Sequence, residues 1–320
     1  MITRRRFLGG VATLTAAPLL PRSSAAASSA APRLKTLLGD YPNTAALKNG
    51  RLSSPLVDFD FVEIKPVHAG FKRTVRDLEF DISELSVVTF LQAKAAGVPL
   101  VLIPTVMFSR FQHPYIVYNA ERGTLTPSDL PGKRVACRLY TATTATWLRG
   151  ILASDYGVDP ASVHWLAFEK PNVAGYRDPA NVQPAPEGAD LVGLLLAGEV
   201  DAIIIEPLPQ DPRVRTLIAN PTAAATSWQA RHQAIQINHM VVAKQSLTRS
   251  NPEAVREFYR LLSESKRLAA KPEGNDPTPY GVEANRRNLG VAIDMVYRQG
   301  MIPRRFGVDE LFDDVTRSLI

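Results

Sequence analysis

Apolar segments of strand length alternate with helical segments along most of this 320-residue chain, and that alternation limits the folds open to it. Residues 57–64, VDFDFVEI, alternate apolar and polar side chains as a half-buried strand does. Residues 100–106, LVLIPTV, are apolar on both faces, as in a strand covered by helices. Because helical segments separate such strands throughout, the sequence predicts an α/β fold with largely parallel sheets.

The N-terminal stretch MITRRRFLGGVATLTAAPLL has the features of a twin-arginine export signal. Arg4, Arg5 and Arg6 precede a modestly apolar run, and small residues suited to a signal peptidase follow it. The run is shorter than the roughly 20 residues that a bilayer span needs, so a retained anchor is the less favoured alternative. We therefore predict a signal peptide over residues 1–31 and a soluble periplasmic chain after its removal.

The length of the remaining chain predicts more than one core. About 290 residues is long for one domain, which typically holds roughly 100 to 200 residues, so two lobes are expected. Residues 177–190, RDPANVQPAPEGAD, are rich in proline and polar residues and predict an exposed loop inside a lobe.

Charge and cysteine content exclude several classes of function. The formal net charge of +6 includes four arginines of the predicted signal, so the exported chain is close to +2. Lysines and arginines are interspersed with acidic residues rather than gathered in a stripe, and no nucleic-acid partner is predicted. The single cysteine, Cys137, lies in the apolar run RVACRL, where a buried small side chain is favoured over a nucleophile.

The sequence offers no pattern for a metal or a cofactor. It contains no G-x-G-x-x-G, Walker or G-x-S-x-G motif. The histidines lack the paired spacing of a zinc site, and only one cysteine could help them. They are His68, His113, His164, His232 and His239. We predict no metal and no cofactor.

The stretch DLPGKRVACRLYTATTATWLRG places Thr141, Thr143 and Thr144 where a strand gives way to a helix. The first turn of a helix carries backbone N–H groups without intrahelical partners and attracts carboxylates. The row of hydroxyls, flanked by the aromatic residues Tyr140 and Trp147, therefore predicts an anion-binding site. The alternative is ordinary N-capping, which stabilises a helix by about 1 kcal/mol without any ligand.

Three further segments carry candidate ligand-binding residues. In FDISELS, Glu84 and Ser86 follow a strand directly, and a plain capped helix is the alternative. In FSRFQHPYIVYN, Arg110 and His113 lie in a loop, where a guanidinium could bind a carboxylate through two parallel hydrogen bonds or simply be solvated. His239 lies on the strand INHMVVAK and could face either the core or a cleft.

These segments together resemble the 4,5-dihydroxyphthalate decarboxylase family over most of the chain. The resemblance is most specific in DPTPYGVEANRRNLGVAIDMVYRQGMIPRRFGVDELF, where PYGVEANR and GMIPRRF recur in order. The family is similar to type II periplasmic solute-binding proteins, which implies two α/β lobes with a ligand cleft between them. It implies lobe one over residues 33–119 and 235–320, and lobe two over 123–234.

The resemblance leaves two functions open. The family name implies the loss of CO2 from an aromatic diacid, with Arg110, His113 and His239 as polar candidates for catalysis. The predicted export signal favours a solute-binding protein that delivers a small organic anion to a membrane transporter of the ABC type. We expect a phthalate-like aromatic carboxylate as ligand and a monomeric protein, with the carboxy-lyase as the alternative.

Overall fold

The structure is a computed structural model that describes residues 1–2, 31–270, 274 and 276–320. The predicted export signal falls almost entirely on residues 3–30 and so lies outside the described residues. Contacts divide the chain into residues 1–30 and 31–320, and the second unit holds every helix and strand described below. No helix in the described part is both long and apolar enough to cross a bilayer.

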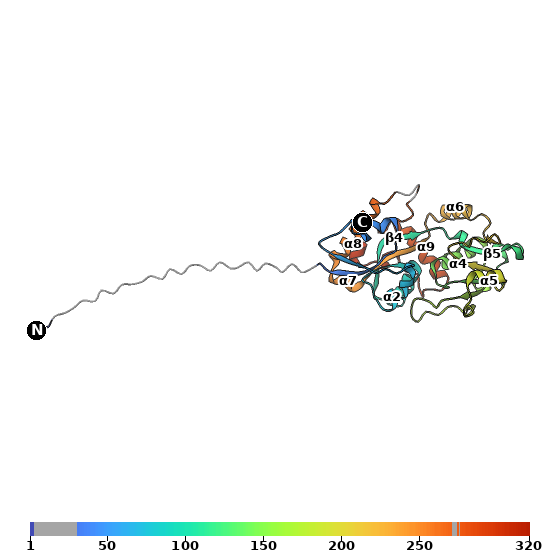
Figure 1. The fold of residues 1–320 in the computed structure, drawn as a ribbon, viewed down its shortest axis with the longest axis horizontal. Coiled ribbons are helices and arrows are strands. Elements are labelled where there is room, and N and C mark those ends of the chain that lie inside the picture. The colour runs from blue at the N-terminus through green and yellow to red at the C-terminus, as the bar shows by residue number, and fades with distance from the viewer. Residues whose placement is uncertain (3–30, 271–273, 275) are drawn as a thin grey trace. The chain divides into compact units, whose positions relative to one another are not determined.

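The first sheet holds five strands in the order β2-β1-β3-β11-β4. Strand β1 pairs in parallel with β2 and β3, and β11 lies antiparallel between β3 and β4 (Figure 1). Its strands are β1 (Arg33–Leu37), β2 (Asp58–Phe61), β3 (Ile82–Ser86), β4 (Leu100–Ser109) and β11 (Ile237–Lys244).

The second sheet holds six strands in the order β10-β5-β9-β6-β7-β8. Strand β6 pairs in parallel with β7 and β9, as does β7 with β8, whereas β5 pairs antiparallel with β9 and β10. Its strands are β5 (Ile116–Asn119), β6 (Arg134–Cys137), β7 (His164–Ala167), β8 (Val182–Pro184), β9 (Ala202–Ile204) and β10 (Val214–Thr216).

The α/β fold is confirmed, and one detail of the prediction is corrected. The strands are largely parallel in direction, as predicted, and one strand in each sheet runs opposite to the others: β11 in the first sheet and β5 in the second. The segment predicted to be a loop over 177–190 contains β8, whose backbone pairs with the edge of β7 although its side chains are largely exposed.

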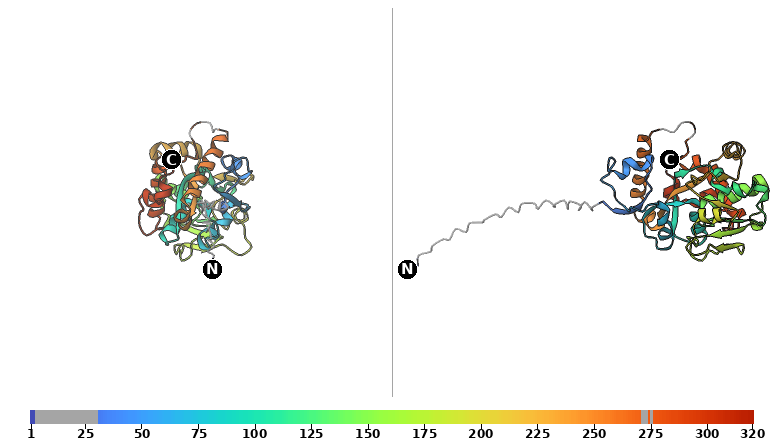
Figure 2. Two further views of the ribbon diagram at one scale, coloured as in Figure 1. Left: turned by 90° about the vertical axis from the view of Figure 1, so that its left-hand side faces the viewer. Right: turned by 45° about the vertical axis from the view of Figure 1, so that its right-hand side comes forward.

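Helices cover the sheets and connect their strands. Ten α-helices are found in the described part: α1 (Pro42–Lys48), α2 (Phe71–Arg76), α3 (Val87–Ala95), α4 (Thr143–Tyr156), α5 (Leu191–Ala197), α6 (Pro221–His232), α7 (Gln245–Ser250), α8 (Pro252–Leu268), α9 (Val282–Arg298) and α10 (Asp314–Arg317). Short 3-10 turns include η1 (Val67–Gly70) and η2 (His113–Tyr115). Helix α8 packs on the first sheet, α5 packs on the second, and α9 contacts both α3 and α4 (Figures 1 and 2).

The chain crosses between the sheets twice, after β4 and before β11. The sequence predicts that lobe one extends to residue 119, but residues 116–119 form β5, which pairs with β9 and β10 of the second sheet. The C-terminal part of the chain also contacts both parts, because α9 contacts α3 as well as α4. Gln299, just after α9, donates a hydrogen bond to the Thr146 carbonyl of α4 at 2.9 Å. The outward crossing therefore comes before residue 116 rather than after residue 119.

One buried tryptophan connects the two parts. Trp147 of α4 is 2% exposed and packs edge-on against Trp228 of α6, with ring centroids 5.7 Å apart. Its indole N–H donates to the backbone carbonyl of Ile237, at the start of β11, at 2.9 Å. The contact joins helix α4, which packs beside the second sheet, to β11, an inner strand of the first sheet.

We expect Trp147→Phe to lower the free energy of unfolding by about 2 to 4 kcal/mol, because it leaves a cavity and a buried carbonyl without its donor. Urea unfolding followed by circular dichroism measures the change. Tyr297→Phe, at an exposed aromatic residue, is the control and should change stability by less than about 0.5 kcal/mol. Equal stabilities of the two variants would contradict this role.

Candidate functional site

A cavity of about 360 Å³ lies between elements of the two sheets. The first sheet and its helices contribute the end of β3, the start of α3, the end of β4 and the start of β11. The second contributes the start of α4 and the segment after β9. Ligands in open α/β folds bind at such strand-to-helix junctions.

Helix α4 begins at the wall of this cavity without a side-chain cap. Its N-cap residue is Ala142, which has no side-chain acceptor, and the first intrahelical bond runs from the Thr146 N–H to the Ala142 carbonyl. In the described part, the N–H groups of Thr143, Thr144 and Ala145 have no hydrogen-bond acceptor. The capping alternative is therefore wrong for this helix, and its first turn keeps donors available.

The Thr143 hydroxyl is also left without a partner. Its side chain is 5% exposed and lines the cavity, and its Oγ has no hydrogen bond among the described residues. A buried polar atom without a partner costs about 1 to 3 kcal/mol. A ligand oxygen in the cavity would remove that cost.

Arg110 reaches the same place from the end of β4. Its Nη2 donates to Thr144 Oγ at 3.3 Å, and its Nη1 forms an ion pair with Glu206, which follows β9. The guanidinium stacks on the rings of Tyr115, 4.1 Å away, and Phe108, 5.2 Å away. Burial lowers the pKa of Arg110, but a guanidinium remains charged at neutral pH.

His239 lies on the cavity wall opposite the start of α4 and forms a hydrogen bond with a buried carboxylate. Its Nδ1 is 2.7 Å from Glu84 Oε1, and Glu84 is 0% exposed. The same carboxylate accepts the Tyr41 hydroxyl at 2.7 Å and the Gly39 N–H at 2.8 Å. Burial and the Glu84 charge raise the pKa of Tyr41, so its hydroxyl stays protonated and donates.

The strand register explains this pair. His239 of β11 lies opposite Ser86 of β3, and Val241 lies opposite Glu84. Opposed residues of antiparallel strands point to one face, so His239 and Glu84 are diagonal neighbours on the same face of the sheet. On its other side His239 lies opposite Phe108 of β4, which also lines the cavity.

The structure brings together part of the predicted set. Ser86, Arg110, Thr143, Thr144 and His239 all line the cavity. Ser86 is also the N-cap of α3, because its hydroxyl accepts the Thr89 N–H at 3.1 Å, so the capping alternative holds for this helix. Glu84 stands behind His239 rather than on the cavity surface.

Four further predicted residues do not line the cavity in the described structure. The ring of Tyr140 lies 3.7 Å from the guanidinium of Arg149, and Trp147 belongs to the core. Thr141 is fully buried, and its Oγ has no partner among the described residues. His113 packs beside Phe111. Thr141, Trp147 and His113 are buried in the protein interior, and Tyr140 lines a different cavity, described below.

Several cavity residues were not predicted. His68 and Phe71 come from η1 and the start of α2, Asn238 from β11, and Glu206 from the segment after β9. Burial and the charge of Arg138 lower the pKa of His68, which favours its neutral form. Of these four residues, only Glu206 could have been selected from the local sequence, because it directly follows the apolar strand DAIII.

Cys137 is buried, as predicted, although it touches the cavity wall. Burial raises the pKa of its thiol to about 12, so the thiolate is not populated near neutral pH. Among the described residues, no group of three or more His, Cys, Asp or Glu side chains is placed to hold a metal ion.

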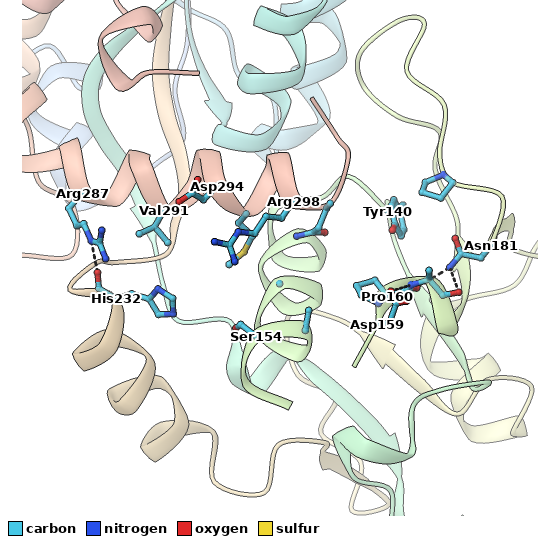
Figure 3. A pocket seen from close by; sticks show the side chains of 16 residues that line it. Tyr140, Ser154, Asp159, Pro160, Asn181, His232, Arg287, Val291, Asp294 and Arg298 are labelled. Atoms are coloured by element: carbon cyan, nitrogen blue, oxygen red, sulfur yellow. Dashed lines mark hydrogen bonds between the residues drawn. The ribbon is translucent and has the colours of Figure 1, made fainter. Parts of the chain in front are cut away.

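A second cavity, of about 600 Å³, lies between α4 and α9 (Figure 3). Arg287, Asp294 and Arg298 of α9 line it, and Tyr140 lies at its far end (Figure 3). Arg287 donates to the His232 carbonyl at 2.7 Å. None of the buried polar atoms that lack partners in the described part belongs to this lining. The first cavity is therefore the stronger candidate.

The two sheets, joined by two crossings with a cavity between them, define the two-lobed fold of type II periplasmic solute-binding proteins. The periplasmic aliphatic sulphonate-binding protein SsuA from Escherichia coli has this fold, with a TM-score of 0.60 at 17% identity. The comparison covers 89% of this chain and 98% of SsuA.

The chain belongs to the NMT1/THI5-like family, whose model matches residues 79–274. Two curated relatives are both named 4,5-dihydroxyphthalate decarboxylase. The relative from Comamonas testosteroni is 28% identical over 88% of this chain and 96% of its own length. The relative from Pseudomonas putida is 30% identical over 61% of this chain and 80% of its own length. The resemblance predicted from the sequence is confirmed.

The buried His113 predicts a pH dependence of stability. Burial lowers its pKa from 6.5 to about 4, so below pH 6.5 the unfolded chain binds a proton that the folded chain does not. This contribution to stability is complete above pH 6.5 and is lost as the pH falls toward 4. His113→Phe should therefore lose less stability than the wild type between pH 7 and pH 4.5, as measured by urea unfolding. Parallel pH profiles would contradict the assignment.

Proposed function

We propose that this protein is an extracytoplasmic solute-binding protein for a small organic anion, an aromatic carboxylate of the phthalate type. The ligand carboxylate is bound by the first turn of α4 and the hydroxyl of Thr143. Arg110 and Thr144 border the same position. The aromatic ring lies toward His239 on the opposite wall.

The observation that carries the proposal is the uncapped start of α4. Three N–H groups and one buried hydroxyl have no partner in the described structure, and all belong to residues that line one cavity. Free helix N-terminal amides bind carboxylates through charge-assisted hydrogen bonds, and the helix dipole adds to the attraction.

The remaining walls suit an aromatic ring. Phe71, Phe108, Leu139 and Ile204 line the cavity and present apolar surface. Its volume of about 360 Å³ lies at the lower end of the roughly 300 to 1,000 Å³ typical of small-molecule sites. A ligand with one ring and few substituents matches this size and this division between polar and apolar walls.

Location and partner follow from the same proposal. The predicted twin-arginine signal would place the chain in the periplasm, and SsuA supports a solute-binding fold. A periplasmic binding protein hands its ligand to a membrane transporter, so a transporter of the ABC type is the proposed partner. The protein would act as a monomer.

A carboxy-lyase acting on the same class of ligand is the second candidate. The Glu84–His239 hydrogen bond favours it, because a buried carboxylate orients an imidazole toward the cavity as in acid–base sites. A protonated His239 would give its proton to the ring carbon as the bond to the carboxylate carbon breaks. CO2 would leave, the electron pair would stay with the ring, and water would reprotonate the imidazole. The names of the two curated relatives support this candidate.

Ligand recovery separates the two candidates. Adding 4,5-dihydroxyphthalate or phthalate should raise the melting temperature by several degrees at 100-fold excess over Kd, because a ligand that binds only the folded state adds about 2.7 kcal/mol there. Chromatography of the mixture should return the acid intact. Release of CO2 with turnover would contradict the binding protein and support the carboxy-lyase.

The double variant Thr143→Ala, Thr144→Ala tests the anion site. It should weaken phthalate binding by about tenfold or more, since it removes two hydroxyl contacts, each worth about 0.5 to 1.5 kcal/mol. Isothermal titration measures the affinity. The matched control is Thr222→Ala, Thr226→Ala, on the exposed face of α6, which should leave affinity unchanged. Equal affinities in both double variants would refute the site.

A further inference from the structure

The cavity already contains a carboxylate of its own. Glu206 forms an ion pair with Arg110, and in the described part this is its sole ion-pair partner. The Arg110 side chain is 14% exposed and that of Glu206 is 44% exposed, so the arginine is fixed in the wall while the glutamate is at the mouth. Both residues line the cavity beside the start of α4.

The position of the guanidinium is set independently of Glu206. Arg110 stacks on Tyr115, its Nε is 3.4 Å from Gln112 Oε1, and its Nη2 donates to Thr144. These contacts hold the plane of the guanidinium while Nη1 faces Glu206. If Glu206 moved away, the same edge would face the cavity and could bind another carboxylate.

The donors in the cavity divide into two groups. The free amides of α4 and the Thr143 hydroxyl suffice for one carboxylate. Arg110 could hold a second one, but Glu206 occupies it. A ligand with one carboxylate can bind while the ion pair stays intact, whereas a ligand with two neighbouring carboxylates has to exchange its second group for Glu206.

We propose that Glu206 is a specificity-determining residue: an internal carboxylate that occupies the second carboxylate position of the ligand site and is displaced from Arg110 by dicarboxylates. The inference rests on the proposed anion site at the start of α4. Because Glu206 is tethered beside Arg110, it competes at a high effective concentration and reduces the gain from the second carboxylate of the ligand. The residue thus sets the relative affinity for mono- and dicarboxylates.

The displacement of Glu206 also makes a contact between the two lobes depend on the number of carboxylates in the ligand. Arg110 follows β4 of the first sheet and Glu206 follows β9 of the second, so their ion pair joins the two. When a dicarboxylate binds, Arg110 exchanges its ion pair with Glu206 for an ion pair with the second carboxylate of the ligand. A monocarboxylate leaves it in place.

The affinities of benzoate and phthalate for the wild type and for Glu206→Gln test the proposal by isothermal titration. The two probes differ by one ortho carboxylate. In Glu206→Gln the phthalate affinity should rise tenfold or more, because Arg110 loses its anionic partner, and the benzoate affinity should change less than threefold. Glu206→Asp, which keeps the charge, should retain the wild-type preference. Glu187→Gln, at an exposed position that forms no ion pair with the other described residues, controls for the change in net charge.

The possible outcomes separate the role of Glu206 from the anion site at the start of α4. A phthalate-to-benzoate ratio that rises in Glu206→Gln but not in Glu187→Gln supports the assignment. An unchanged ratio, or an equal rise for both probes, overturns it while leaving the anion site intact. If the wild type binds neither benzoate nor phthalate, the anion site itself is refuted, and the proposed role of Glu206 is refuted with it. Circular dichroism and urea unfolding confirm that each variant is folded.

Discussion

Strand β11 hydrogen-bonds antiparallel to β3 on one side and to β4 on the other, and the cavity depends on this placement. The strand returns the chain from the second sheet to the first, where it pairs with β4, the last strand before the outward crossing. It also sets the register that places His239 diagonally from Glu84 and opposite Phe108. A shift by one residue would turn His239 to the other face of the sheet and separate it from the buried carboxylate.

The two walls of the cavity differ in chemistry because of how each is built. The α4 wall consists of hydrogen-bond donors, since its first turn has no cap and Thr143 has no partner in the described part. The β11 wall holds an imidazole oriented by Glu84, a carboxylate that three donors can reach. This division fits a ligand that is charged at one end and aromatic at the other, whether the protein releases it unchanged or removes a carboxyl group.

Local sequence patterns predicted the elements but only part of the site. The threonine row located the start of α4, and Arg110 and His239 were selected by residue type. The same patterns could not tell which side chains of a turn face outward, so Thr141, Tyr140, Trp147 and His113 were wrongly placed in the cleft. Glu206 approaches Arg110 only through the pairing of strands about 100 residues apart, and that pairing has no local signal in the sequence.

The central claim is that the free amides of α4 bind a carboxylate. Titration of the ¹⁵N-labelled protein with benzoate, followed by amide NMR, tests it most directly. The amide signals of Thr143, Thr144 and Ala145 should shift downfield and saturate together, because each N–H gains an anionic acceptor. If those signals stay in place while signals around Arg287 and Arg298 move, the ligand binds in the cavity between α4 and α9 and the account is wrong.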